Sequence, residues 1–253
     1  MIAHRSTFDL SRRVVLGAAL AAWAWPARAG DRLVVLAAAS LKPALDEIAA
    51  GWAAPVAVSY GGSGTIARQA AAGAPADVVL LAAEDWMDWL VGQGVLAGAA
   101  RSVAGNRLVL AGPAEAPPLA LERAAVLERL GRDGRLAMGD PMSVPAGRYA
   151  QQALETLSLW DAVAPRALMA ENVRAALAYV ARGDVPLGLV YGSDTRGTGV
   201  SLLAEVPGSA HAPITYPGAV LARAGPGATA FLDHVAASGE VFARHGFGPA
   251  PAS

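Results

Sequence analysis

Short apolar runs rich in Leu and Val alternate with Ala-rich stretches along most of the chain. The runs are too short for amphipathic helices, so they predict strands that are buried on both faces. In the stretches between them, apolar residues recur at helical spacing, as at Leu41, Leu45 and Ile48, and the stretches end near Gly or Pro. This alternation favours an α/β fold with open, mostly parallel sheets and helices on both faces.

The pattern can be divided into individual elements. The expected strands cover residues 33–36, 56–60, 78–81, 108–110, 135–138, 187–190 and 219–221. The expected helices cover residues 41–51, 65–72, a stretch through Trp86 and Leu90 that ends at Gly92, and residues 145–157, 173–182 and 228–244. The Pro-rich stretch 113–118 is the clearest compositional break, so we expect two α/β lobes. In such folds, ligands bind beyond the carboxyl ends of the strands.

The first 29 residues follow a different pattern. A polar start containing Arg12 and Arg13 precedes an apolar run at 14–24, which ends before an Ala-x-Ala sequence at Ala27 to Ala29. Eleven apolar residues are too few to span a membrane, which takes about 20. A basic start, a short apolar core and Ala-x-Ala are typical of a secretory signal peptide cleaved after Ala29. The arginine pair also resembles a twin-arginine signal, so both export routes stay open. We expect a periplasmic protein.

Composition excludes several classes of protein. The chain has no Cys, which excludes disulfide scaffolds, thiolate metal sites and cysteine nucleophiles. Its 20 basic and 21 acidic residues give a net charge of −1, whereas a nucleic-acid partner requires a basic stripe. The hydrophobic fraction of 54% reflects the many Ala residues. It implies no membrane span, because no run of 18 apolar residues follows residue 29. We therefore expect neither nucleic-acid binding nor membrane spans.

Motifs for enzyme chemistry are missing. The sequence GGSGT, from Gly61 to Thr65, is close to the nucleophile elbow of serine hydrolases, but Thr65 stands where that motif needs Gly. Metal-binding H-x-x-H and nucleotide-binding G-x-G-x-x-G sequences do not occur. Beyond the leader, the histidines all lie near the C-terminus: His211, His234 and His245. We expect no enzyme, no metal-ligating cluster and no cofactor, with a hydrolase that uses Ser63 as a rival hypothesis.

Small polar residues gather where expected strands end and helices begin. Ser40 and Ser63 each follow a strand and precede a helix. Pro145 begins a third helix, Asn172 is a good N-cap for a fourth, and Tyr191 ends a strand. Singly, each has a simple explanation, since a Ser before a helix is more often an N-cap than a ligand contact. Together, they present hydroxyls and free helix N–H groups, which make an anion site of neutral donors.

Several motifs that include these residues resemble the periplasmic molybdate-binding proteins of molybdate ABC transporters. The motifs are AAASL at 37–41, GSGTIARQ at 62–69, GAPADV at 73–78, WM at 86–87, GDP at 139–141, VPAG at 144–147 and PLGLVYGSD at 186–194. The resemblance runs from about residue 33 to Gly246 and Phe247, in order and with matching spacing. Each motif is weak alone, but the set is specific.

The resemblance implies a fold and a division of the chain. The fold is a two-lobed, type II periplasmic binding protein, in which each lobe is a mixed, mostly parallel sheet flanked by helices, with the ligand in the cleft. The implied first lobe is discontinuous, with residues 30–111 plus 217–253, and the second lobe covers residues 112–216. The chain would cross between the lobes near 111–113 and return near 213–217.

The resemblance also implies the ligand contacts. Ser40 and Ser63 would come from the first lobe, and Ala146, Val173 and Tyr191 from the second. Hydroxyl groups would serve at Ser40, Ser63 and Tyr191. Backbone N–H groups would serve at Ser63, Ala146 and Val173. The only metal would be the molybdenum of the bound oxyanion, and the sequence leaves open whether nearby basic residues contribute: Lys42, Arg148 and Arg174.

The implied function is capture of molybdate, and of tungstate with it, for delivery to the permease of an ABC importer and, through the permease, to its ATPase. We expect a monomer. A site made only of donors accepts a deprotonated dianion, but it leaves the proton of hydrogen phosphate without an acceptor, at a cost of about 1–3 kcal/mol. Sulfate carries no proton either, so size must exclude it. A receptor for sulfate or another tetrahedral oxyanion is the alternative. The ligand-sensing domain of a transcription regulator is a further rival, which the export leader disfavours.

Overall fold

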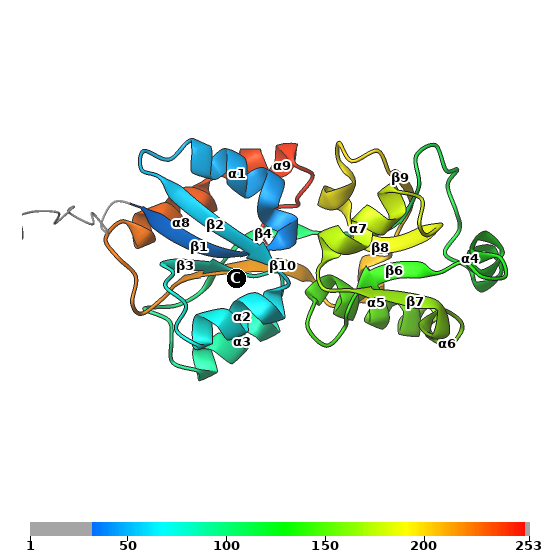
Figure 1. Ribbon diagram of the computed structural model, residues 1–253, viewed down its shortest axis with the longest axis horizontal. Helices are drawn as coiled ribbons and strands as arrows, with labels where there is room; N and C mark the ends of the chain where they lie inside the picture. The colour runs from blue at the N-terminus through cyan, green and yellow to red at the C-terminus, as the bar shows by residue number, and fades with distance from the viewer. Residues whose placement is uncertain (1–31, 251–253) are drawn as a thin grey trace, which may run out of the picture. The chain divides into compact units, whose positions relative to one another are not determined.

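Two five-stranded sheets, each with helices on both faces, make up the part of the chain that the computed structural model describes, residues 32–250 (Figure 1). The expected signal peptide, residues 1–29, lies outside the described residues. The strands are β1 (Leu33–Ala38), β2 (Val56–Gly61), β3 (Val78–Leu80), β4 (Arg101–Asn106), β5 (Leu108–Gly112), β6 (Leu136–Gly139), β7 (Ala167–Ala170), β8 (Leu187–Tyr191), β9 (Ser201–Glu205) and β10 (Ile214–Val220). The helices are α1 (Lys42–Ala50), α2 (Ser63–Ala71), α3 (Glu84–Gly92), α4 (Arg123–Leu130), α5 (Pro145–Thr156), α6 (Trp160–Val163), α7 (Val173–Ala181), α8 (Ala228–Ala237) and α9 (Gly239–Arg244). Short 3₁₀ helices are η1 (Ala39–Leu41), η2 (Ala164–Arg166), η3 (Gly192–Thr195) and η4 (Gly208–Ala210).

The first sheet has the strand order β2-β1-β3-β10-β4. β1 pairs in parallel with β2 and β3, whereas β10 pairs antiparallel with β3 and β4. Helices α1, α8 and α9 cover one face, and α2 and α3 cover the other (Figure 1). Because both faces are covered, the central strands are almost wholly apolar, and all three residues of β3 are buried.

The second sheet has the order β7-β6-β8-β5-β9. β6 pairs in parallel with β7 and β8, and β5 pairs antiparallel with β8 and β9. Helix α7 lies on one face, and α5 and α6 lie on the other (Figure 1). A Cβ on Gly188 of β8 would come within 2.5 Å of Val180 Cγ2 of α7, so this glycine lets the helix pack directly on the strand. No helix within residues 32–250 combines the length and hydropathy that a membrane span needs.

The chain passes between the sheets earlier than the sequence indicated. β4 ends at Asn106 and β5 begins at Leu108, so Arg107 alone separates a first-sheet strand from a second-sheet strand. The expectation that residues 108–111 belong with the first sheet is wrong, because Val109 and Leu110 pair with β8 and β9. The return lies just before Ile214, where β10 begins, at the start of the expected range 213–217, and the lobe boundary at residue 217 was therefore too late. The other residue bounds of the two lobes stay predictions.

Other elements differ from expectation for local reasons. β4 has the sequence RSVAGN, which lacks an apolar run, and β7 and β9 are partly exposed strands at the edges of the second sheet. All three were missed, as were helices α4 and α6. The expected final helix is interrupted at Ser238, and Gly239 begins α9. Each sheet has as many antiparallel as parallel pairings, so the sheets are mixed, as expected, but not mostly parallel.

Candidate functional site

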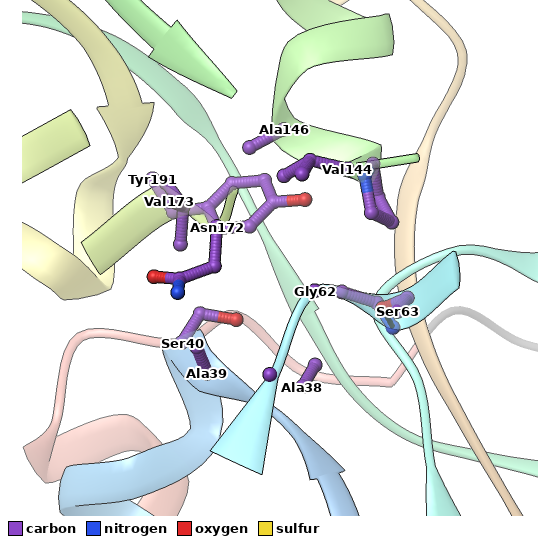
Figure 2. Close-up of a pocket in the computed structure, with 13 residues that line it drawn as sticks. Ala38, Ala39, Ser40, Gly62, Ser63, Val144, Ala146, Asn172, Val173 and Tyr191 are labelled. Carbon is purple, nitrogen blue, oxygen red and sulfur yellow. Dashed lines mark hydrogen bonds between the residues drawn. The ribbon is translucent and has the colours of Figure 1, made fainter. Parts of the chain in front are cut away.

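A small pocket lies between the carboxyl ends of first-sheet strands and the N-termini of second-sheet helices (Figure 2). It encloses about 200 Å³ of empty space, part of which is open to solvent. Its lining comprises Ala38, Ala39, Ser40, Gly61, Gly62, Ser63, Ala82, Val144, Pro145, Ala146, Asn172, Val173 and Tyr191. All five residues that the sequence selected are therefore brought together here. Their contact with a ligand stays a prediction.

Two buried serines form the first-sheet side of the pocket. Ser40 lies in η1, directly after β1, and its Oγ is 3.0 Å from Tyr216 Oη. Ser63 is the first residue of α2, and its Oγ accepts a hydrogen bond of 3.0 Å from the N–H of Ala82. Each serine is at most 2% exposed, so each hydroxyl depends on the protein or on a ligand for its hydrogen bonds.

The glycines on either side of Ser63 allow a close approach to the opposite side. A Cβ on Gly62 would lie 2.6 Å from the carbonyl oxygen of Glu171, and a Cβ on Gly64 would lie 2.7 Å from that of Ser143. The N–H of Gly64 donates to the same Ser143 oxygen at 3.0 Å. The backbone at the start of α2 therefore contacts the segments that precede α5 and α7. Side chains at Gly62 and Gly64 would push α2 away from these segments.

The first turn of α5 leaves one donor free. Pro145 occupies the first helical position, as expected, and has no N–H. The N–H groups of Gly147 and Arg148 both donate to the carbonyl oxygen of Val144. Among the described residues, the N–H of Ala146 has no backbone partner in this turn. Because the first N–H groups of a helix carry partial positive charge, this donor suits an anion.

Helix α7 repeats this arrangement with a side-chain cap. Asn172 is confirmed as the N-cap, since its Oδ1 accepts a hydrogen bond of 2.9 Å from the N–H of Ala175. The N–H of Ala176 donates to the Asn172 carbonyl oxygen. Within residues 32–250, the N–H of Val173 is left without a backbone partner and lies at the pocket. Asn172 therefore satisfies the N–H groups of Ala175 and Ala176, and the N–H of Val173 remains for a ligand.

Tyr191 supplies a third hydroxyl. It ends β8 and is 1% exposed, and in the described part of the chain its Oη has no hydrogen-bond partner. The hydroxyls of Tyr191 and Ser40 both point into the space between the labelled residues (Figure 2). Burial raises the pKa of Tyr191 well above its usual value, so the phenol keeps its proton and can donate it.

The nearby basic side chains are paired elsewhere. Lys42 Nζ lies 2.8 Å from Asp46 Oδ2, and Arg148 forms an ion pair with Asp85. Arg174 Nη1 lies 3.9 Å from Asp194 Oδ1. None of these cations lines the pocket, whose lining has no charged side chain. Within residues 32–250, no group of three or more His, Asp or Glu is arranged to hold a metal ion.

Sequence reasoning missed the residues behind the lining. Tyr216 in β10 and Asn106 at the end of β4 are hydrogen-bonded to each other, and Tyr216 contacts Ser40. Asp194 of η3 is buried, and its Oδ2 accepts from the N–H of Tyr191 at 3.3 Å. Burial raises the pKa of Asp194 to about 7, against the opposing effects of Arg174 and the Tyr191 N–H. Tyr216 lies in an apolar stretch, so the sequence alone presents it as a core residue.

Comparison with known proteins identifies the family. Residues 33–248 match the model of the bacterial extracellular solute-binding proteins, and the chain belongs to this family. The molybdate-binding protein ModA of Escherichia coli K12 is 39% identical over 227 residues, which cover 85% of this chain and 88% of that protein. This relative is a solute-binding protein rather than an enzyme.

Solved structures share the fold. The periplasmic molybdate-binding protein of Azotobacter vinelandii has a TM-score of 0.75 at 24% identity, covering 85% of this chain and 98% of that chain. The sulfate-binding protein SubI of Mycobacterium tuberculosis H37Rv has a TM-score of 0.71 at 18% identity, covering 87% of each chain. At these identities, the likeness shows the fold alone. The two-lobed α/β fold expected from the sequence is confirmed.

Proposed function

We propose that this protein is a periplasmic receptor that captures molybdate, and tungstate with it, and delivers the anion to an ABC importer. The observation that carries the proposal is a pocket lined by three buried hydroxyl-bearing residues and by the N-termini of three helices, with no charged side chain. The 39% identity to a molybdate-binding protein supports the choice of anion. The pocket needs no cofactor and no resident metal, because the molybdenum arrives within the ligand.

The chemistry of the lining favours a fully deprotonated anion. Ser40, Ser63 and Tyr191 supply O–H donors, and Ala146 and Val173 supply N–H donors at helix N-termini. These helix ends stabilise negative charge without a counter-ion. A protonated oxyanion would bury its own O–H against donors, which costs about 1–3 kcal/mol. The proposed protein is therefore a binding protein, not an enzyme.

Delivery would depend on a closed form that the membrane partner recognises. The Gly64–Ser143 hydrogen bond and the Asp85–Arg148 ion pair join the first-sheet and second-sheet parts of the chain and support such a form. We propose that the closed monomer docks on the permease, which couples release to its ATPase.

Thermal unfolding of the purified protein tests the ligand. Molybdate, tungstate, sulfate and phosphate are each added at equal ionic strength, with sodium chloride as the control. A ligand at 100 times its dissociation constant adds about 2.7 kcal/mol to the free energy of unfolding. For a chain of this size, the midpoint rises by roughly 5–10 °C. We expect a rise with molybdate and tungstate only. A rise with sulfate alone would establish the alternative receptor, and no rise with any oxyanion would overturn the proposal.

A further inference from the structure

A chain of hydrogen bonds runs from the end of β4 to the pocket. Asn106 Nδ2 lies 3.0 Å from Tyr216 Oη, which in turn lies 3.0 Å from Ser40 Oγ. Tyr216 is fully buried, and Asn106 is half-buried. Of these three residues, only Ser40 lines the pocket. The other two lie behind it, and their hydrogen bonds reach the pocket through Ser40.

The contacts of Asn106 decide which end of its amide faces Tyr216. Its Oδ1 accepts from the N–H of Arg107 at 2.9 Å and from the N–H of Ser193 at 3.5 Å. Its Nδ2 therefore faces Ser193 Oγ at 2.8 Å and Tyr216 Oη. An amide nitrogen only donates, so Tyr216 Oη must accept from it.

This fixes the remaining protons in the chain. A phenol has one proton, and the contact with Asn106 uses Tyr216 Oη as an acceptor. The Tyr216 proton is then available for Ser40 Oγ. Burial also raises the pKa of Tyr216 well above its usual value, so the proton is retained. Ser40 Oγ accepts this proton, and its own single proton is free to point into the pocket.

We propose that Asn106 and Tyr216 are positioning residues that make Ser40 a hydrogen-bond donor to the ligand and so determine selectivity against protonated oxyanions. The inference rests on the proposed function, since it requires that the pocket bind an oxyanion. Ser63 is forced into the same role by the N–H of Ala82, a backbone group that no side-chain substitution alters. At Ser40, side chains determine the polarity, and a substitution can reverse it.

Asn106→Asp is the direct test, because it changes a donor into an acceptor at constant size. The carboxylate still accepts from the N–H groups of Arg107 and Ser193, and the Ser193 hydroxyl can rotate to donate to it. Tyr216 then donates to residue 106, Ser40 donates to Tyr216, and Ser40 Oγ presents a lone pair to the pocket. That lone pair repels an oxygen of molybdate and accepts the proton of hydrogen phosphate.

Titration calorimetry at pH 8 measures the dissociation constants of molybdate and phosphate for wild type and variant. Both probes are then chiefly dianions, so the added charge weakens both alike, and the ratio of the two constants reports hydrogen-bond polarity. We expect the preference for molybdate over phosphate to fall by about tenfold or more. An unchanged ratio in Asn106→Asp overturns the inference, while molybdate binding by the wild type would still support the proposed function.

Two further variants complete the test. Ser193→Ala removes the other partner of the Asn106 amide nitrogen without changing the polarity at Tyr216, so the ratio should equal that of the wild type. Asn106→Leu removes the donor without adding charge, which leaves Ser40 free to take either role, and its ratio should lie between those of wild type and Asn106→Asp. If Asn106→Asp does not fold, the uncharged Asn106→Leu tests the inference in its place. A wild-type ratio in Asn106→Leu would then overturn the inference.

Discussion

The two sides of the pocket supply their donors in different ways. On the first-sheet side, Ser40 and Ser63 offer side-chain hydroxyls whose protons are directed by the groups behind them. On the second-sheet side, Ala146 and Val173 offer backbone N–H groups whose direction is fixed by their helices. Neighbouring groups can reverse a hydroxyl, but not a helix N–H. If the pocket binds an oxyanion as proposed, both sides contribute to affinity, whereas selectivity between oxyanions depends on the hydrogen-bond polarity of the hydroxyls on the first-sheet side.

Ser63→Ala should have the largest effect, because it acts on both the ligand and the fold. The variant loses an O–H donor to the anion and leaves the buried N–H of Ala82 without its acceptor. We expect molybdate affinity to fall about 100-fold and the free energy of unfolding of the unliganded protein to fall by about 1–3 kcal/mol. Calorimetry and urea unfolding measure the two. Ser59→Ala, at an exposed position of β2, is the control. Wild-type affinity in Ser63→Ala would remove Ser63 from the site.

Val173→Pro tests the second-sheet side of the pocket by deleting the backbone N–H donor of α7. Proline is favoured at the first position of a helix, and Asn172 before it has φ −158° and ψ 167°, which suits a residue that precedes proline. We expect the melting temperature of the unliganded protein to be nearly unchanged and molybdate affinity to fall roughly 10- to 50-fold, measured by calorimetry. Val173→Ala keeps the N–H and should bind as the wild type does. If the alanine variant loses as much affinity as the proline variant, the side chain matters and the N–H does not.

Asp194→Asn tests the second-sheet side of the pocket further, because the carboxyl group of Asp194 is buried behind Tyr191. The pKa of Asp194 in the folded protein is raised to about 7, above the usual 3.8. The stability that the protonated carboxyl contributes is therefore fully present below pH 3.8. The contribution is lost as pH rises through about 7. Between pH 6 and pH 8, the wild type should lose about 1.4 kcal/mol more than Asp194→Asn.

Urea unfolding of the unliganded proteins at the two pH values measures this difference. Asparagine at position 194 can still accept from the N–H of Tyr191, so the variant keeps that contact. Asp184→Asn, which removes an exposed carboxylate paired with Arg182, is the control and should follow the wild type. Parallel pH profiles for wild type and Asp194→Asn would show that Asp194 does not titrate in this range.

The sequence predicted the lining of the pocket better than its support. Ser40 and Ser63 could be placed together because each follows a strand, and carboxyl ends of parallel strands meet at one edge of a sheet. Tyr191 ends a strand of the other sheet, and only the family resemblance placed it with the two serines. Tyr216 could not be predicted as part of the site, because its role depends on the antiparallel pairing of β10 with β4, more than 100 residues away. No local sequence pattern indicates that pairing. Asn106 ends a strand without an apolar run, so its position in the sheet was equally hidden.

The place of β10 in the first sheet also has a consequence for the order in which the chain can fold. β10 lies between β3 and β4, so these two strands have no partner on their facing edges until residue 220 has been synthesised. The second sheet uses a continuous segment, from β5 to β9, and can form as soon as that segment is complete. Because contacts distant in sequence form slowly, the half of the protein made first is the half that is finished last. During that interval, the open edges of β3 and β4 can pair with other chains, which exposes this part of the chain to aggregation.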